Sequence, residues 1–344
     1  MESNVARQMK CCRFVWILLM GHLCWAQTPY RTLSLKTSGP QPLNAFLYHL
    51  VDPTGQIDIT KAIQLQKDGK FTASFTPTSR QDFGYNTDFH WLYFALTSPE
   101  KSDLMLEIEY ANLDYVELFE VKNGKITPLG LSGDRFQFRQ RPYTNNNYVF
   151  PIRLQAGEKA QYFLMLDQPH AILSFFIKLW HRSDFLRIDR EEYMLWGIYV
   201  GIICIVMIMN LVMLLATKDW IYLWYSLYLH FMTMPLFSDA GLGFQYLWSD
   251  FPKINAYAPV YLYVWAAMIA QTTFMQYFIQ QTRRNSRVFW WINAFKIMVA
   301  MALVAAIGIP LFEVKGREEY MYKIVSQTTS YLVPIIVVLT VIRL

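Results

Sequence analysis

Hydrophobic and polar positions alternate along the first half of the chain and then give way to long apolar blocks. Up to about residue 190, apolar residues mostly alternate with polar ones, which is the period-two pattern of half-buried strands. From Met194 onward they run in blocks long enough to cross a bilayer. This change predicts a β-rich domain followed by a bundle of transmembrane helices.

The alternating part breaks into short runs between residues 28 and 180. Leu104, Leu106 and Ile108 share one face of such a run, while Glu107 and Glu109 share the other. The pair Asn123-Gly124 predicts a hairpin, because both residue types tolerate a positive φ. The clearer predicted strands are 45–51, 71–75, 90–98, 104–110, 115–121, 148–154, 162–166 and 173–180. Short, regularly spaced strands predict an all-β, jelly-roll-like sandwich.

The apolar part predicts an all-α transmembrane helix bundle from 194 to 344, joined to the sandwich by a charged linker at 181–193. The predicted spans are 194–216, 220–238, 259–279, 289–312 and 320–342. The loop after the third span carries Arg283, Arg284 and Arg287, and basic loops stay in the cytoplasm. This charge bias places residues 28–180 outside the membrane.

Residues 1–26 have the pattern of a cleavable signal peptide. Arg7, Lys10 and Arg13 precede a short apolar run, and Cys24-Trp25-Ala26 places small residues where a signal peptidase cuts. Export agrees with the orientation given by the basic loops. We therefore expect a multi-pass protein of the bacterial inner membrane with a periplasmic N-terminal domain.

Composition narrows the function classes. The net charge is +5, and the basic residues form no stripe interleaved with aromatics, which argues against nucleic acid. Aromatic residues make up 17% of the chain and many flank the apolar blocks, as expected beside a lipid bilayer. The predicted sandwich has no cysteine, and its histidines are scattered. We expect no catalytic residues, no metal site and no cofactor.

Several motifs carry a resemblance to a known family over residues 30–344. The stretches are 90–96 around a tryptophan, 113–119, Gly133-Asp134, 139–142, 149–152, 197–201, Asn210-Leu211, Lys218-Asp219 and 241–248. Together they resemble the bacterial seven-transmembrane receptors with diverse intracellular signalling modules. The resemblance implies an extracellular sensor domain of carbohydrate-binding type and a cytoplasmic signalling module or partner. The sequence departs from that family by stopping after a fifth predicted span, so we expect an incomplete set of spans.

Aromatic residues of the sandwich are the first candidates for binding a ligand. Trp91, Tyr110 and Tyr115 could stack against the apolar C–H faces of a sugar, as the resemblance implies. The alternative is ordinary core packing for Trp91 and ordinary strand-end positions for the tyrosines.

Charged residues of the sandwich give a second group of candidates. Continued alternation through 136–141 would put Arg139 and Arg141 on one face, where two guanidinium groups could hold an anion. The alternative is a salt bridge from these arginines to Asp134. The acidic residues Glu107, Glu109, Asp114, Glu117 and Glu120 could suggest a glycosidase, but their alternation favours a solvated sheet face.

Polar residues inside the predicted spans are costly in lipid and therefore informative. Asn210, His230, Gln271 and Gln276 are candidates for hydrogen bonds between helices, and Lys296 for snorkelling to the cytoplasmic surface. A ligand pocket or an ion path is the alternative role.

The sequence as a whole predicts a membrane receptor. Its outer domain would bind a small molecule such as a carbohydrate, and its helices would transmit the signal, as a monomer or an oligomer. The rival hypothesis is an accessory envelope protein whose sandwich docks a protein partner.

Overall fold

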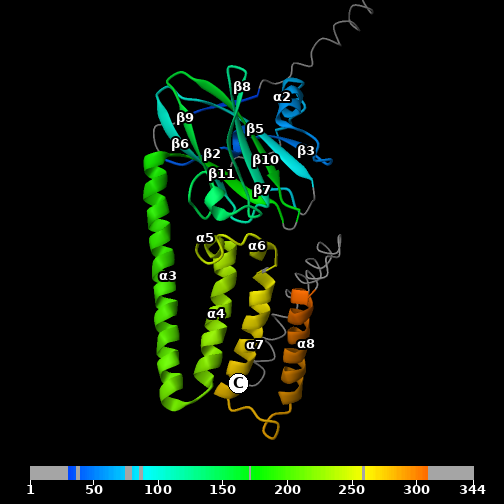
Figure 1. Cartoon of the computed structure of the whole chain (residues 1–344), viewed down its shortest axis with the longest axis vertical. Coiled ribbons are helices and arrows are strands. Elements are labelled where there is room, and N and C mark those ends of the chain that lie inside the picture. The colour runs from blue at the N-terminus through cyan, green and yellow to red at the C-terminus, as the bar shows by residue number, and fades with distance from the viewer. Residues whose placement is uncertain are drawn as a thin grey trace, which may run out of the picture.

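The computed structural model describes residues 30–35, 39–73, 80–84, 88–169, 172–257 and 260–308. A β-domain occupies one end of the molecule and long helices extend from it (Figure 1). The predicted signal peptide at 1–26 and the predicted span at 320–342 lie outside the described residues.

Two sheets form the β-domain, which confirms the predicted sandwich. The six-stranded sheet has the order β1-β5-β10-β7-β8, with β3 paired to β5, and the five-stranded sheet has the order β2-β11-β6-β9, with β4 paired to β11. The strands are β1 (Thr32–Ser34), β2 (Gln41–Pro42), β3 (Tyr48–Asp52), β4 (Gln81–Asp82), β5 (Phe89–Thr97), β6 (Ser102–Glu109), β7 (Tyr115–Lys122), β8 (Lys125–Ser132), β9 (Tyr148–Leu154), β10 (Lys159–Asp167) and β11 (Ser174–His181).

The main core lies between the two sheets. Leu106 and Ile108 point into it, as the alternation of their strand predicts, and both are fully buried. Leu92 and Phe150 face them from other strands. Burying each of these side chains contributes about 1.5–3 kcal/mol to the free energy of folding, so this core holds the sandwich together.

A short helix covers the outer face of the six-stranded sheet. Helix α2 (Ile59–Lys67) begins after Asp58, whose side chain accepts a hydrogen bond from the main-chain N–H of Lys61 at 2.8 Å. Ala62 is fully buried against Trp91 and its neighbours. The alternation did not predict α2, because a helix of 9 residues is too short to give a clear helical period.

The remaining helices extend from the sandwich. They are α3 (Arg182–Thr217), α4 (Ile221–Asp239), α5 (Leu242–Tyr246), α6 (Lys253–Tyr257), α7 (Val260–Phe278) and α8 (Phe289–Gly308). Helix α3 continues directly from β11, so the predicted linker is its first part, and its 36 residues extend about 54 Å. Within the described residues, α3 is the helix whose length and mean hydropathy of 2.8 suffice to cross a membrane.

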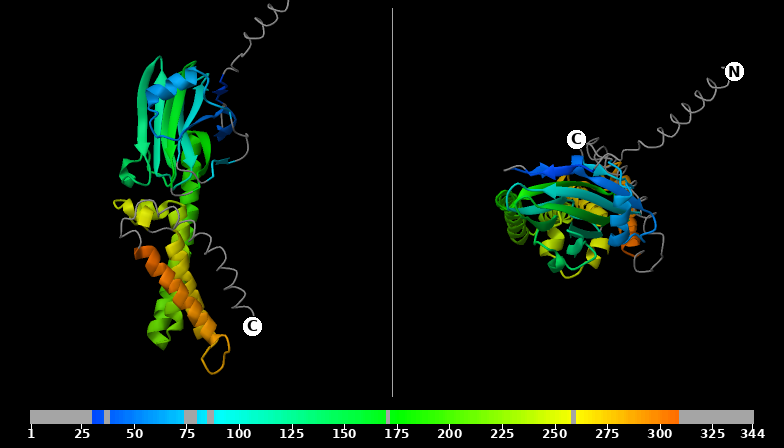
Figure 2. Two further views of the ribbon diagram at one scale, coloured as in Figure 1. Left: turned by 90° about the vertical axis from the view of Figure 1, so that its right-hand side faces the viewer. Right: turned by 90° about the horizontal axis from the view of Figure 1, so that it is seen from above.

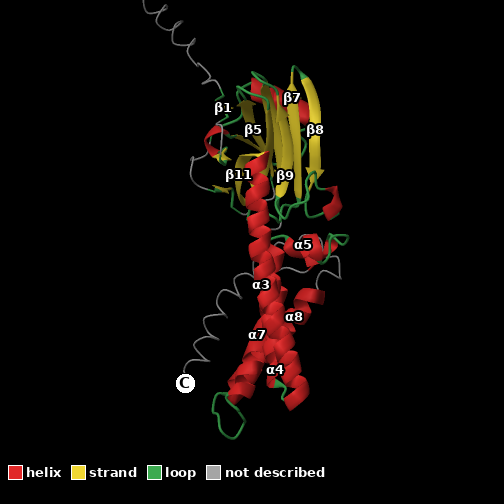
Figure 3. Cartoon of the chain, turned by 90° about the vertical axis from the view of Figure 1, so that its left-hand side faces the viewer, coloured by secondary structure: helices red, strands yellow, loops and turns green. Residues whose placement is uncertain are grey.

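Helices α4 and α7 pack side by side, and α8 lies against α7 (Figures 1 and 2). The short helices α5 and α6 lie between these helices and the β-domain (Figures 1 and 3). The β-domain thus meets the helices at two places, the start of α3 and the segment holding α5 and α6.

Candidate functional site

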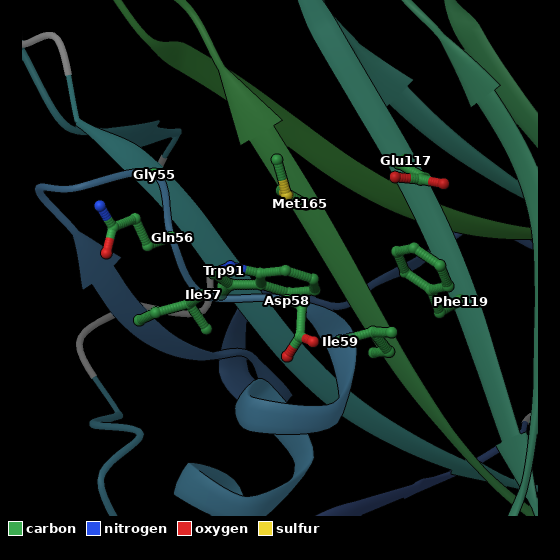
Figure 4. A pocket seen from close by; sticks show the side chains of 9 residues that line it. All are labelled: Gly55, Gln56, Ile57, Asp58, Ile59, Trp91, Glu117, Phe119 and Met165. Carbon is green, nitrogen blue, oxygen red and sulfur yellow. The ribbon is translucent and has the colours of Figure 1, made fainter.

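A cavity of about 300 Å³ opens beside α2 on the outer face of the six-stranded sheet (Figure 4). Its floor is one row of neighbouring strand positions, because Met165 on β10 pairs with Trp91 on β5 and with Glu117 on β7. The lining residues are Gly55, Gln56, Ile57, Asp58, Ile59, Trp91, Glu117, Phe119 and Met165.

Two aromatic rings form the apolar part of this cavity. The rings of Trp91 and Phe119 are stacked, with centroids 6.2 Å apart and planes inclined by 28°. Trp91 is only 1% exposed, so it also belongs to the packing under α2. Its buried indole N–H has no hydrogen-bond acceptor among the described residues, whereas such groups are normally paired. The indole N–H of Trp91 is therefore a buried donor without an acceptor in a residue that lines the cavity.

The loop at residues 53–58 forms one side of the cavity, and hydrogen bonds to Asp52 fix its conformation. The Asp52 carboxylate accepts hydrogen bonds from the main-chain N–H groups of Thr54 and Ile57, at 3.0 and 2.8 Å. Burial raises the pKa of Asp52, but these hydrogen bonds outweigh burial and leave the pKa below its usual value. Gly55 has φ +64°, and a Cβ there would lie 2.8 Å from the ring of Phe89. The wall is thus fixed before any ligand arrives.

Among the described residues that line the cavity, the charged side chains are carboxylates. Asp58 caps α2, and Glu117 Oε2 accepts a hydrogen bond from the hydroxyl of Tyr115 at 2.6 Å. Burial, followed by this bond to Glu117, raises the pKa of Tyr115. The cavity therefore combines an apolar aromatic floor with acceptor groups at its edge.

A second group of contacts, which we call the joint, connects the β-domain to the helices. We call residues 133–147 the docking loop and residues 240–257 the outer loop. Phe138 of the docking loop packs against Phe244 and Trp248 of the outer loop, with the ring centroids of Phe138 and Phe244 5.5 Å apart. The main-chain N–H of Phe138 also donates to the carbonyl of Ser249 at 3.1 Å.

Side-chain amides complete this joint. Asn255 Nδ2 donates to the carbonyl of Asp134 at 3.1 Å, and Asn146 Nδ2 donates to the carbonyl of Ala240 at 3.0 Å. The hydroxyl of Tyr193 on α3 donates to Gln245 Oε1 at 2.8 Å. The docking loop, the outer loop and α3 are therefore linked to one another.

The guanidinium of Arg141 lies at the centre of the joint. Its Nη1 donates to the three successive carbonyls of residues 145–147, at 2.8, 2.9 and 3.2 Å. Its Cζ lies 4.5 Å from the ring centroid of Phe138 and 4.2 Å from that of Tyr148. Burial lowers the pKa of Arg141, and Tyr148 and Asp134 oppose that effect.

Carboxylates and an arginine fix the start of the docking loop. Arg135 pairs with Asp114 through Nε and Nη2. Burial raises the pKa of Asp134, and the adjacent Asp114 raises it further, against the effects of Arg135 and Arg141. A Cβ at Gly133, where φ is +150°, would lie 2.1 Å from the carbonyl oxygen of Asp114. The loop leaves β8 in close contact with the residue that precedes β7.

The two arginines predicted to share a strand face do not do so. Residues Phe138–Gln140 form a 3-10 turn in place of a strand, so the alternation ends there. Arg139 is exposed and bonds to Gln137, while Arg141 is buried in the joint. The predicted salt bridge to Asp134 is replaced by the pair between Arg135 and Asp114.

Two further expectations change with the fold. Glu107 was expected on a solvated face, but it is 8% exposed and accepts hydrogen bonds from Asn147 Nδ2 and Trp180 Nε1, at 2.9 and 2.8 Å. The start of α3 buries this part of the face, which sequence alternation could not reveal. Tyr110 lies away from the cavity, and its hydroxyl donates to the carbonyl of Ile172 at 3.0 Å.

The fold brings together two histidines that are distant in sequence. His49 on β3 and His90 on β5 stack, with Nε2 and Nδ1 2.9 Å apart. Burial lowers both pKa values to about 4. The described residues contain no group of three or more side chains suited to hold a metal ion.

The polar residues of the helical part make different contacts. Lys296 Nζ on α8 donates to Gln276 Oε1 on α7 at 2.6 Å, two residues before the end of α7. Gln276 Nε2 also donates to Gln281 at 3.1 Å. Asn210 bonds to Val206 of its own helix. His230 packs on Phe231, and Gln271 is exposed.

Two family models match consecutive parts of the chain. Residues 44–181 match the model described as 7TMR-DISM extracellular 2, and residues 192–344 match the model described as 7TM diverse intracellular signalling. No curated protein matches the chain.

Proposed function

This chain belongs to the seven-transmembrane receptors with diverse intracellular signalling, a family of membrane proteins with an extracellular sensor domain, and on that basis we propose that its outer domain senses a small carbohydrate. The ligand binds in the cavity beside α2, and the helices carry the signal to a cytoplasmic partner. We propose no catalytic step.

The unpaired indole N–H of Trp91 carries this proposal. A sugar ring has an apolar face that suits the stacked rings of Trp91 and Phe119, and its hydroxyls both accept and donate hydrogen bonds. One hydroxyl would accept from Trp91, while others would donate to Glu117 and Asp58. A cavity of about 300 Å³ is at the lower end of the usual range for small-molecule sites and suits one or two rings.

The charge of the cavity predicts which sugars bind. Because its charged lining groups are carboxylates, a sugar acid would be repelled and an amino sugar attracted. The expected order of affinity is glucosamine, then glucose, then glucuronate.

Calorimetric titration of the full chain in lipid nanodiscs with these three sugars tests the proposal. The variants Trp91→Phe, which keeps an aromatic ring but loses the N–H, and Glu117→Gln should each weaken glucosamine binding about tenfold. Glu109→Gln is the matched control, because Glu109 pairs with Lys178 and both lie on the five-stranded sheet, away from the cavity. This variant should bind glucosamine with wild-type affinity. Equal binding by all variants, tightest binding of glucuronate, or no sugar binding at all would contradict the proposal.

A further inference from the structure

Contacts between side chains run continuously from the cavity to the joint with the helices. Glu117 lines the cavity and accepts a hydrogen bond from the hydroxyl of Tyr115 at 2.6 Å. The ring of Tyr115 packs against Phe136 of the docking loop, with ring centroids 5.9 Å apart. Two residues further along the loop, Phe138 lies in the joint with Phe244 and Trp248.

The main chain follows the same route. Asp134 N–H donates to the carbonyl of Leu113 at 2.7 Å, just before β7 begins, and the carbonyl of Asp134 accepts from Asn255 in the outer loop. Glu117 is three residues after Asp114, which corresponds to about 10 Å along an extended strand. The distance from the cavity to the joint is therefore short, and it is bridged by a regular strand.

We propose that the sensor domain acts on the membrane helices through this route, from Glu117 and Tyr115 to the docking loop and then to the outer loop between α4 and α7. The proposal rests on the cavity assigned above as the ligand site and names how its occupancy is transmitted. Helix α3 contacts α4, where the ring centroids of Trp196 and Phe237 lie 5.9 Å apart, but no residue of its apolar window is buried, so in this proposal it serves mainly as a tether.

The ligand-free and ligand-bound states differ in the hydrogen bonds that the Glu117 carboxylate accepts. A ligand that donates a hydrogen bond to the Glu117 carboxylate competes with the Tyr115 hydroxyl for the same group. Release of that hydroxyl frees the ring that supports Phe136, and the docking loop shifts on the outer loop. A ligand can move such an equilibrium only through contacts that differ between the two states, and Glu117 is such a contact.

The sandwich contains a matched control for this route. The hydroxyl of Tyr162 donates to Glu120 Oε1 at 2.8 Å, which is the same kind of bond on the same sheet. Tyr162 points into the core between the sheets and has no described contact with the docking loop. Tyr115→Phe and Tyr162→Phe each remove one tyrosine–carboxylate bond and keep the ring.

Hydrogen–deuterium exchange of the full chain in nanodiscs, without ligand, tests the route independently of the ligand's identity. Tyr115→Phe should raise amide exchange about tenfold in residues 134–141 and 244–251, because one hydrogen bond to a charged group is lost. Tyr162→Phe should leave exchange in these two segments at the wild-type rate.

Each result decides the proposal. Faster exchange in both segments for Tyr115→Phe alone supports the route, and unchanged exchange in the outer loop overturns it. Equal acceleration by both variants also overturns it, since that would reflect a general loss of stability. Thermal unfolding of both variants identifies such a loss. Failure here leaves sugar binding intact, whereas failure of the sugar titration leaves this exchange pattern unaffected.

Discussion

The histidine pair illustrates how single residues depend on their surroundings in this protein. His49 and His90 lie on adjacent strands beside Phe83, whose ring centroid is 4.5 Å from that of His49. Burial favours the neutral imidazole, and for His49 the neighbouring His90 adds to this effect. Asp88 opposes it at His90. Both rings are therefore neutral near pH 7.

Acidification is expected to destabilise the sandwich through this pair. The folded pKa values of about 4 lie below the unfolded value of about 6.5, so the unfolded chain binds more protons between these values. This contribution to stability is complete above pH 6.5 and is lost as the pH falls towards 4. Thermal unfolding at pH 7.5, 5.5 and 4.5 measures it.

Variants separate the pair from other titrating groups. The double variant His49→Asn/His90→Asn should show a smaller fall in unfolding temperature between pH 7.5 and 4.5 than the wild type. An unchanged slope in the double variant would contradict the assignment to this pair.

At the scale of elements, the local sequence predicts a hairpin turn correctly but does not predict the shape of a segment that packs against a distant part of the chain. The hairpin at Asn123-Gly124 forms as predicted between β7 and β8, with φ of 51° and 78° at its two central residues. The alternation through 136–141 gives no hint of the 3-10 turn, because contact with the outer loop shapes that segment. The turn between α4 and α5 lies in the same outer loop, with Gly241 close to Ala111 and Asn146.

Gly241 in that turn is expected to be essential for the joint. Its φ is +72°, and an added Cβ would lie 2.7 Å from both Ala111 Cβ and the carbonyl oxygen of Asn146. Gly241→Ala should therefore destabilise the joint by about 1–3 kcal/mol and expose the outer loop to limited proteolysis.

Gly124→Ala is the matched control, because Gly124 has φ +78° and nothing within 4 Å of an added Cβ. It shares the backbone strain of Gly241→Ala but lacks the steric clash. If both variants were cleaved equally in the outer loop, the close approach at Gly241 would not be what holds the joint.

At the scale of the whole molecule, the β-domain and the helices are one assembly with two connections. Helix α3 is a covalent continuation of β11, and the joint is a packed contact between segments more than 90 residues apart in sequence. In the route proposed above, the joint carries the signal from the β-domain to α4 and α7, alongside the covalent link through α3.

We expect the basic loop between α7 and α8 to lie in the cytoplasm and the β-domain to lie on the opposite side of the membrane. Lys125 lies in the sensor domain, and Arg284 lies in the exposed loop between α7 and α8. In a chain whose own cysteines are replaced by serine, Lys125→Cys should react with a membrane-impermeant maleimide in intact cells. Arg284→Cys should react only after permeabilisation. Reaction of Arg284→Cys in intact cells would contradict this orientation.

The sequence by itself determined the sandwich, the helical part and the family, because strand periodicity, apolar blocks and short motifs are local properties of the chain. It also made Trp91 and Tyr115 candidates for binding a ligand, since aromatic residues on strands are visible in the pattern. Their roles were undecided, because core packing and ligand binding use the same residue types.

Only the tertiary structure decided which residues meet. Strand pairing places Trp91, Met165 and Glu117 in one row, although 74 residues separate Trp91 from Met165. Burial of Glu107 and Arg141 depends on α3 and the outer loop, which lie far away in sequence. The cavity and the joint arise from such long-range contacts, and no local pattern encodes them.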